Sequence, residues 1–143
     1  MDTQIKARLA ALDWDRIAEQ IETRGHALGG RLLRAGECAD LMALFDCDAR
    51  FRGTIEMARH RFGEGRYRYF ADPLPALVAE LRRELYRHLS PIANAMAAKL
   101  PGGQTYPKEL EAYLRACHAA GQAKPTPLLL RYETGGYNRL HQD

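Results

Sequence analysis

Apolar residues recur every three to four positions over residues 4–24, which predicts helical structure in this part of the chain. Asp13 interrupts the pattern as a candidate N-cap of a second helix, and Gly25 marks where that helix would end. Residues 26–33 contain two adjacent glycines and are expected to form a short strand or an irregular connector. A further helix is predicted over residues 37–45, with four side chains on one apolar face: Cys38, Leu41, Met42 and Phe45.

The pattern changes to that of strands at residues 54–62 and 66–70, with Gly63-Glu64-Gly65 as the loop of a hairpin. Pro73 and Pro75 then precede a long predicted helix, because proline is tolerated in a first turn. An apolar stripe runs along it, and Pro91 would kink or split it. The stripe consists of Leu77, Leu81, Leu85, Leu89 and Ile92. Another helix is expected over residues 107–119.

The last part of the chain predicts a strand at residues 126–132, a turn at 133–136 and a return strand at 137–143. The order of elements indicates an α+β fold. We expect one domain over residues 1–143, in which residues 1–125 are a helical support carrying the hairpin 54–70 and residues 126–143 are the first core strands. A closed sheet cannot be built from so few strands, so the chain is expected to stop within its β core.

Composition narrows the class of protein without naming a function. The chain has 143 residues, ordinary apolar content and a net charge of +3, which permits an anionic partner without requiring one. No apolar run reaches the length of a membrane span, and the N-terminus lacks the layout of a secretory signal. The three cysteines are odd in number and unclustered, which favours reduced thiols and a cytoplasmic protein.

The chain ends on His141-Gln142-Asp143. On a strand, residues two apart point to the same face, so one imidazole and one carboxylate would project into a common site. These are two of the three ligands in the 2-His-1-carboxylate set that holds non-haem Fe(II). The tripeptide alone is a weak signal, and a polar chain end is the alternative.

The surrounding residues strengthen the iron interpretation. An apolar strand precedes Tyr132, a glycine-containing turn follows, and the His-x-Asp motif begins nine residues after the tyrosine. This arrangement resembles the entry into the double-stranded β-helix, or jelly roll, of 2-oxoglutarate/Fe(II) oxygenases, particularly the AlkB-like branch. Upstream segments resemble bacterial oxygenases of this kind that are proposed to act on nucleic acid: residues 57–63, 67–70, 91–94, and 117–122 with 125–127.

The resemblance implies roles for individual residues. His141 and Asp143 would be the first two iron ligands, and Tyr132 would hydrogen-bond the cosubstrate 2-oxoglutarate. The AlkB-like branch has an asparagine at the position of Leu130, so that second cosubstrate contact is not matched here. A later histidine and a later arginine would complete the site. We therefore expect the 143-residue chain alone to turn over no substrate, although its parent protein would be a dioxygenase.

Cations alternate with aromatic residues over residues 59–70. Such composition is typical of nucleic-acid surfaces, where arginines meet phosphates and aromatic rings stack on bases. Three hairpin residues, Arg66, Tyr67 and Arg68, together with Arg139 are thus candidate substrate-binding residues. An amphipathic hairpin, with tyrosines packed inward and arginines in water, explains the same alternation.

Three hypotheses follow for function. The first is a dioxygenase that uses Fe(II), 2-oxoglutarate and dioxygen to hydroxylate a C–H bond, including oxidative demethylation of alkylated nucleic acid in DNA repair. The second is a hydroxylase of an amino acid or protein side chain, of the prolyl type. The third is a non-catalytic helical module that binds nucleic acid through the hairpin, with binding that weakens as salt rises.

Overall fold

The computed structural model describes residues 3–141, which form two compact units. The first combines Met1–Arg34 with Ala76–Ala123, and the second combines Ala35–Pro75 with Lys124–Asp143. The predicted hairpin therefore lies in the same unit as the C-terminal strands and the helical segment after residue 34. How many domains fold independently stays a prediction. No helix among the described residues is both long and apolar enough to cross a membrane.

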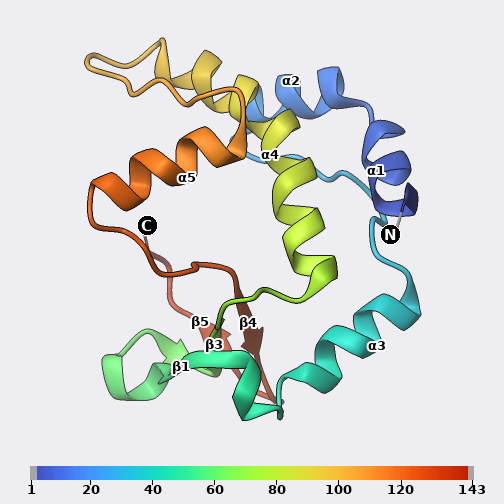
Figure 1. Ribbon diagram of the computed structural model, residues 1–143, viewed down its shortest axis with the longest axis vertical. Coiled ribbons are helices and arrows are strands. Elements are labelled where there is room, and N and C mark those ends of the chain that lie inside the picture. The colour runs from blue at the N-terminus through green and yellow to red at the C-terminus, as the bar shows by residue number, and fades with distance from the viewer. Residues whose placement is uncertain (1–2, 142–143) are drawn as a thin grey trace. The chain divides into compact units, whose positions relative to one another are not determined.

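The first unit is built from four helices: α1 (Thr3–Ala10), α2 (Trp14–Arg24), α4 (Ala76–Ala97) and α5 (Leu110–Ala119) (Figure 1). Helix α4 contacts each of the other three. Ile5 and Leu9 of α1 are fully buried. The predicted break between α1 and α2 is confirmed, because the Asp13 side chain accepts a hydrogen bond from the Arg16 amide and Gly25 adopts the left-handed conformation at the end of α2.

Polar and aromatic contacts join α2 and the segment before α5 to α4. The Trp14 indole stacks on the His88 ring with centroids 4.2 Å apart, and its N–H donates to the Leu9 carbonyl. Asn94 exchanges two hydrogen bonds with the backbone of Tyr106. Pro91 does not split α4, which continues as one helix to Ala97. Packing of α4 against three neighbours compensates for the amide that proline lacks.

The second unit holds a three-stranded antiparallel sheet in the order β1-β3-β4, formed by Phe51–Glu56, Arg66–Phe70 and Leu128–Arg131. A separate two-stranded pairing joins β2 (Gly63–Glu64) to β5 (Tyr137–Asn138). Helix α3 (Ala35–Leu44) precedes the sheet. Short 3₁₀ turns occupy Asp48–Arg50 and Met57–His60. The α+β class is confirmed. The strands described within residues 3–141 do not close a jelly roll, and that finer architecture stays a proposal.

Two sequence predictions about the strands are wrong. The first strand of the hairpin begins at Phe51 and ends at Glu56, because Met57–His60 turns the chain and Arg61 adopts a left-handed conformation. Residues 63 and 64 are a strand and not a loop. The return strand after the turn at 133–136 is also shorter than predicted, and it pairs with β2 instead of β4, whose recorded partner is β3.

The predicted apolar face of α3 is wrong as well. Cys38 and Met42 are exposed, and Phe45 is buried but lies just beyond the helix, which ends at Leu44. Helical spacing does not govern the direction of a side chain after the last helical residue. The Phe45 ring instead lies near Phe51, with centroids 6.1 Å apart, and Phe51 stacks on Phe70 of β3.

Alternation along the strands gives the sheet two different faces. The arginine face carries Arg66 and Arg68 of β3 and Arg131 of β4, beside the Phe45–Phe51–Phe70 cluster. The tyrosine face carries Tyr67 and Tyr69 of β3, which pair in register with Leu130 and Leu128 of β4. The predicted site residues are thus divided between two surfaces.

Candidate functional site

A cavity of about 630 Å³ opens on the tyrosine face within the second unit. Strands β3 and β4 supply its floor, the turn after β1 supplies one wall, and the segment after β5 supplies another. His141 lies in this cavity with Tyr67 and Arg139, although the three are far apart in sequence. The full lining is Met57, Arg61, Phe62, Tyr67, Tyr69, Leu128, Leu130, Asn138, Arg139, Leu140 and His141.

His141 has the hydrogen bonding expected of a metal-binding histidine. Its Nδ1 atom lies 2.6 Å from the Arg139 carbonyl oxygen, which can only accept, so Nδ1 carries the proton. In the neutral ring the lone pair then resides on Nε2. Histidines that bind metals commonly donate through one nitrogen to a backbone carbonyl and ligate through the other. The imidazole therefore fits the role of an iron ligand.

The structure does not describe the second predicted iron ligand, Asp143. Asp143 lies outside the described residues, and β5 ends at Asn138, so His141 follows the strand instead of lying within it. Among residues 3–141, no group of three or more histidine, cysteine, aspartate or glutamate side chains is placed to hold a metal ion. The pair His141 and Asp143 stays a prediction.

Tyr67 and Tyr69 of β3 both line the cavity. Burial raises the pKa of Tyr67 above its ordinary value, and the neighbouring Tyr69 raises it further. The two rings meet edge to face with centroids 5.6 Å apart. Tyr67 therefore offers a hydroxyl that can donate a hydrogen bond to a ligand in the cavity.

Tyr132, the predicted cosubstrate contact, lies at the edge of this site. Its ring covers Gly65 so closely that a β-carbon built there would lie 2.8 Å from Tyr132 Cδ1 and 3.1 Å from Met57 Sδ. Met57 lines the cavity, and Tyr132 comes directly after β4, which ends at Arg131. Tyr132 keeps 41% of its surface exposed. It is placed beside the cavity, but it does not appear in the lining described above.

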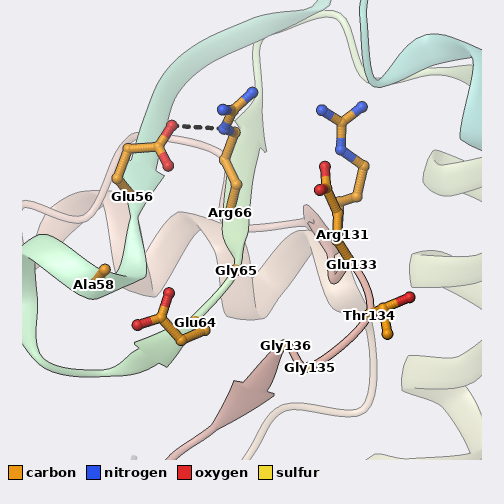
Figure 2. A pocket seen from close by; sticks show the side chains of 10 residues that line it. All are labelled: Glu56, Ala58, Glu64, Gly65, Arg66, Arg131, Glu133, Thr134, Gly135 and Gly136. Carbon is orange, nitrogen blue, oxygen red and sulfur yellow. Dashed lines mark ion pairs between the residues drawn. The ribbon is translucent and has the colours of Figure 1, made fainter.

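The arginine face has a second cavity, of about 410 Å³. Figure 2 shows Arg66 and Arg131 projecting from neighbouring strands toward the same side, with Glu56 joined to Arg66. Arg66 and Arg131 are directly opposed in register, which is unfavourable for like charges unless each is neutralised. Glu56 pairs with Arg66 at 2.5 Å, and Asp46 pairs with Arg131 at 3.0 Å. Because the lining also includes Glu64 and Glu133, this cavity does not favour an anion.

Arg68 has a structural role on the same face. Only 11% of its side chain is exposed. It donates to the Phe45 carbonyl, Asp48 and Thr54, and it lies 4.3 Å from the centre of the Phe51 ring. The amphipathic reading of the hairpin thus describes the tyrosines correctly but not Arg68, which is mostly buried.

Comparison with known families adds the decisive observation. Residues 65–143, more than half of the chain, match the family described as "Oxygenase, catalysing oxidative methylation of damaged DNA". The chain belongs to this oxygenase family. The matched segment contains β3, β4, β5 and His141, which supply most of the cavity lining on the tyrosine face, whereas Met57, Arg61 and Phe62 precede it.

Part of this oxygenase chain is similar to two curated proteins. Two uncharacterized proteins of Mycobacterium tuberculosis, MT2286 of strain CDC 1551 / Oshkosh and Rv2227 of strain H37Rv, are each 43% identical over 74 residues. That match covers 52% of this chain and 32% of each relative. The chain therefore spans about a third of the length of the curated relatives it matches. No solved structure matches the chain.

The structure of the oxygenase chain brings together some predicted residues and separates others. His141, Tyr67 and Arg139 share the cavity, whereas Arg66 and Arg68 lie on the opposite face of the sheet. Arg61 and Phe62 also line the cavity. Both lie in the stretch 59–70 whose alternation of cations and aromatic residues indicated a nucleic-acid surface, but the sequence did not single them out as substrate-binding residues.

Replacing Arg68 with alanine should reduce the free energy of unfolding of the oxygenase chain by about 2 kcal/mol, because the Phe45 carbonyl loses its donor and Phe51 loses its packing partner. The matched control Arg66→Ala breaks an ion pair that is about 40% exposed on both sides and should cost about 0.5 kcal/mol. Urea unfolding measures both. Equal losses for the two variants would contradict a structural role specific to Arg68.

Proposed function

We propose that this chain is part of an Fe(II)- and 2-oxoglutarate-dependent dioxygenase that removes methyl groups from damaged DNA by oxidation. Membership of the oxygenase family supports the reaction class, and the description of that family names damaged DNA. An oxygenase adds oxygen to carbon, so oxidation at a methyl group leads to its removal. The observation that carries the proposal is the placement of His141 in a cavity shared with aromatic and cationic side chains.

The proposed ligands are His141 and Asp143. Bound Fe(II) would supply the activation of dioxygen, with open positions for the 2-oxo acid. His141 is oriented through its Nδ1 bond to the Arg139 carbonyl, which presents Nε2 as the ligand atom. Tyr132, beside Met57 at the edge of the cavity, is the proposed contact to 2-oxoglutarate.

The side chains of the tyrosine face would hold the substrate. Tyr67, whose raised pKa keeps its hydroxyl protonated, can donate to a base, while Leu128 and Leu130 give the floor an apolar surface that excludes water. Overall, 2-oxoglutarate and dioxygen become succinate and carbon dioxide, and one oxygen atom enters the N-methyl group. The resulting hydroxymethyl group leaves as formaldehyde, which restores the N–H of the base.

The alternatives differ from this proposal in measurable ways. A hydroxylase of amino-acid side chains would share the iron chemistry, but the family description and the cationic cavity favour a nucleic-acid substrate. A non-catalytic binding module would require no iron, and the oxygenase family assignment favours catalysis.

The test uses the protein as its native source expresses it, loaded with Fe(II) without oxygen. Dioxygen, 2-oxoglutarate and a single-stranded DNA oligonucleotide carrying an N-methylated base are then added, with the unmethylated oligonucleotide as control. We expect succinate and formaldehyde in equal amounts with the methylated strand only. Absence of iron-dependent succinate formation under these conditions would overturn the proposal, and succinate without dependence on any oligonucleotide would remove the DNA substrate.

A further inference from the structure

Arg61 and Phe62, which line the cavity, lie in a turn that backbone hydrogen bonds stabilise. Arg61 has φ of 59°, the only non-glycine residue with a positive φ among those described. The Arg61 amide donates to the Ala58 carbonyl and the Phe62 amide donates to the Met57 carbonyl. Backbone strain of this kind is retained where the surroundings over-determine it and is common at ligand-binding positions. The turn therefore fixes the direction of both side chains.

Arg139 is tied to the same turn from the other end of the sequence. Its amide donates to the Phe62 carbonyl at 2.8 Å, next to the pairing of Gly63 with Asn138. The arginines at positions 61 and 139 thus line one cavity from two segments that the backbone joins directly. His141 follows two residues after Arg139.

Arg61 and Arg139 have no acidic side chain beside them among the described residues that line the cavity. Among residues 3–141, neither Arg61 nor Arg139 forms an ion pair with a carboxylate. None of the described residues that line the cavity is acidic. The arginine face is different, because Arg66, Arg68 and Arg131 each have a carboxylate partner. Within the described part of the chain, the arginines that lack a carboxylate partner are therefore on the side of His141, where their charge complements an anion.

An exposed aromatic ring completes the rim. Phe62 lines the cavity but keeps 48% of its surface exposed. Its ring stacks on the His60 ring, with centroids 5.4 Å apart. An exposed phenylalanine between two arginines presents a flat apolar surface beside positive charge. Proteins that bind single-stranded nucleic acid use this combination, with stacking on bases and cations on phosphates.

We propose that Arg61, Phe62 and Arg139 form a nucleotide-binding rim that holds a single-stranded nucleic acid, with the two guanidinium groups on phosphates and the Phe62 ring against a base. The inference rests on the proposed function for its substrate and adds the residues that bind it. It replaces Arg66 and Arg68, which the sequence favoured, by residues on the cavity side. A volume of about 630 Å³ lies within the roughly 300–1,000 Å³ of pockets that hold ligands the size of a nucleotide.

Binding of a fluorescein-labelled single-stranded DNA oligonucleotide to the full chain, followed by anisotropy from 50 to 500 mM salt without iron or 2-oxoglutarate, tests the rim. Each of Arg61→Gln and Arg139→Gln should weaken binding about five-fold at 0.1 M salt and reduce the salt slope by about 0.7, the value for one phosphate contact on a single strand. Phe62→Ala should weaken binding about ten-fold with an unchanged slope, because stacking releases no counterions.

Arg59→Gln is the matched control, since Arg59 lies in the same turn and carries the same charge but does not line the cavity. It should change affinity less than two-fold. Arg61→Lys, which retains the charge in the same backbone conformation, should recover most of the affinity. Circular dichroism melting of every variant shows whether it is folded.

Equal losses of affinity in Arg59→Gln and Arg61→Gln would overturn the proposed binding rim. They would mean that the whole positively charged surface attracts the oligonucleotide without a defined site. Unchanged binding in Arg61→Gln and Arg139→Gln would overturn it as well, even if the native protein forms succinate. Conversely, rim-dependent binding in a protein that forms no succinate would support the rim while removing the proposed catalysis. The two proposals can therefore fail separately.

Discussion

Replacing His141 with alanine is expected to reduce Fe(II)- and 2-oxoglutarate-dependent succinate formation by more than about 100-fold in the natively expressed protein. Loss of a partner that only orients a ligand already costs about 10–100-fold in metal affinity or activity, so loss of a ligand itself should exceed that. The measurement is succinate produced per minute, together with the iron retained after anaerobic dialysis. Both should decrease together, because in the proposed site the same imidazole would hold the metal.

His118→Ala is the matched control for this prediction. His118 is an exposed histidine of α5, in the other unit of the chain. Its replacement removes the same chemical group without touching the cavity, and it should leave iron retention and succinate formation unchanged. If His141→Ala retained iron and turned over like the wild type, His141 would not be a ligand, and the iron assignment for the His-x-Asp motif would be abandoned.

Replacing Gly63 with alanine is expected to reduce the free energy of unfolding by about 3 kcal/mol. Gly63 has φ of 132°, which side-chain-bearing residues rarely adopt, and a β-carbon there would lie 2.1 Å from the Tyr137 carbonyl oxygen. The short β2–β5 pairing has no room for a methyl group. Breaking it would also release the bond from the Arg139 amide to the Phe62 carbonyl, and with it the placement of His141.

Gly53→Ala provides the comparison. Gly53 lies in β1 of the same unit, has no positive φ, and a β-carbon built on it meets no atom within 4 Å. Its replacement should change stability by less than about 1 kcal/mol. Urea unfolding of both variants measures the difference. Similar stabilities for Gly63→Ala and Gly53→Ala would show that the β2–β5 pairing does not contribute to the fold.

The helices were predictable because their signals are local. The Asp13 cap, the left-handed Gly25 and the start of α4 after Pro75 all depend on residues within one or two turns of each other. The strands β3 and β4 were found for the same reason, since alternation and an apolar run can be read in a short window. The family resemblance carried by residues near the C-terminus correctly indicated an oxygenase. Its finer part, dependence on Fe(II) and 2-oxoglutarate, stays a proposal.

Strand pairing was not predictable to the same degree. The sequence suggests a hairpin between β4 and the segment after it, because the two are neighbours with a glycine turn between them. In the structure, β5 pairs with β2, more than seventy residues earlier. That choice depends on Gly63, whose missing side chain lets the Tyr137 backbone approach. No local sequence pattern predicts which distant strand will pack against the position where Gly63 lacks a side chain.

The sequence by itself determined the helices, the α+β class and the candidate ligand His141, because propensity, capping and motif spacing act over a few residues. The tertiary structure decided which arginines face that histidine. Alternation along β3 sends Arg66 and Arg68 to the face where carboxylates and Phe51 occupy them. The left-handed turn at Arg61 and the bond from Arg139 to Phe62 instead bring to the cavity two arginines that have no carboxylate partner within residues 3–141. The placement of these arginines in one cavity depends on backbone contacts between segments that are distant in sequence and come together only in the folded chain.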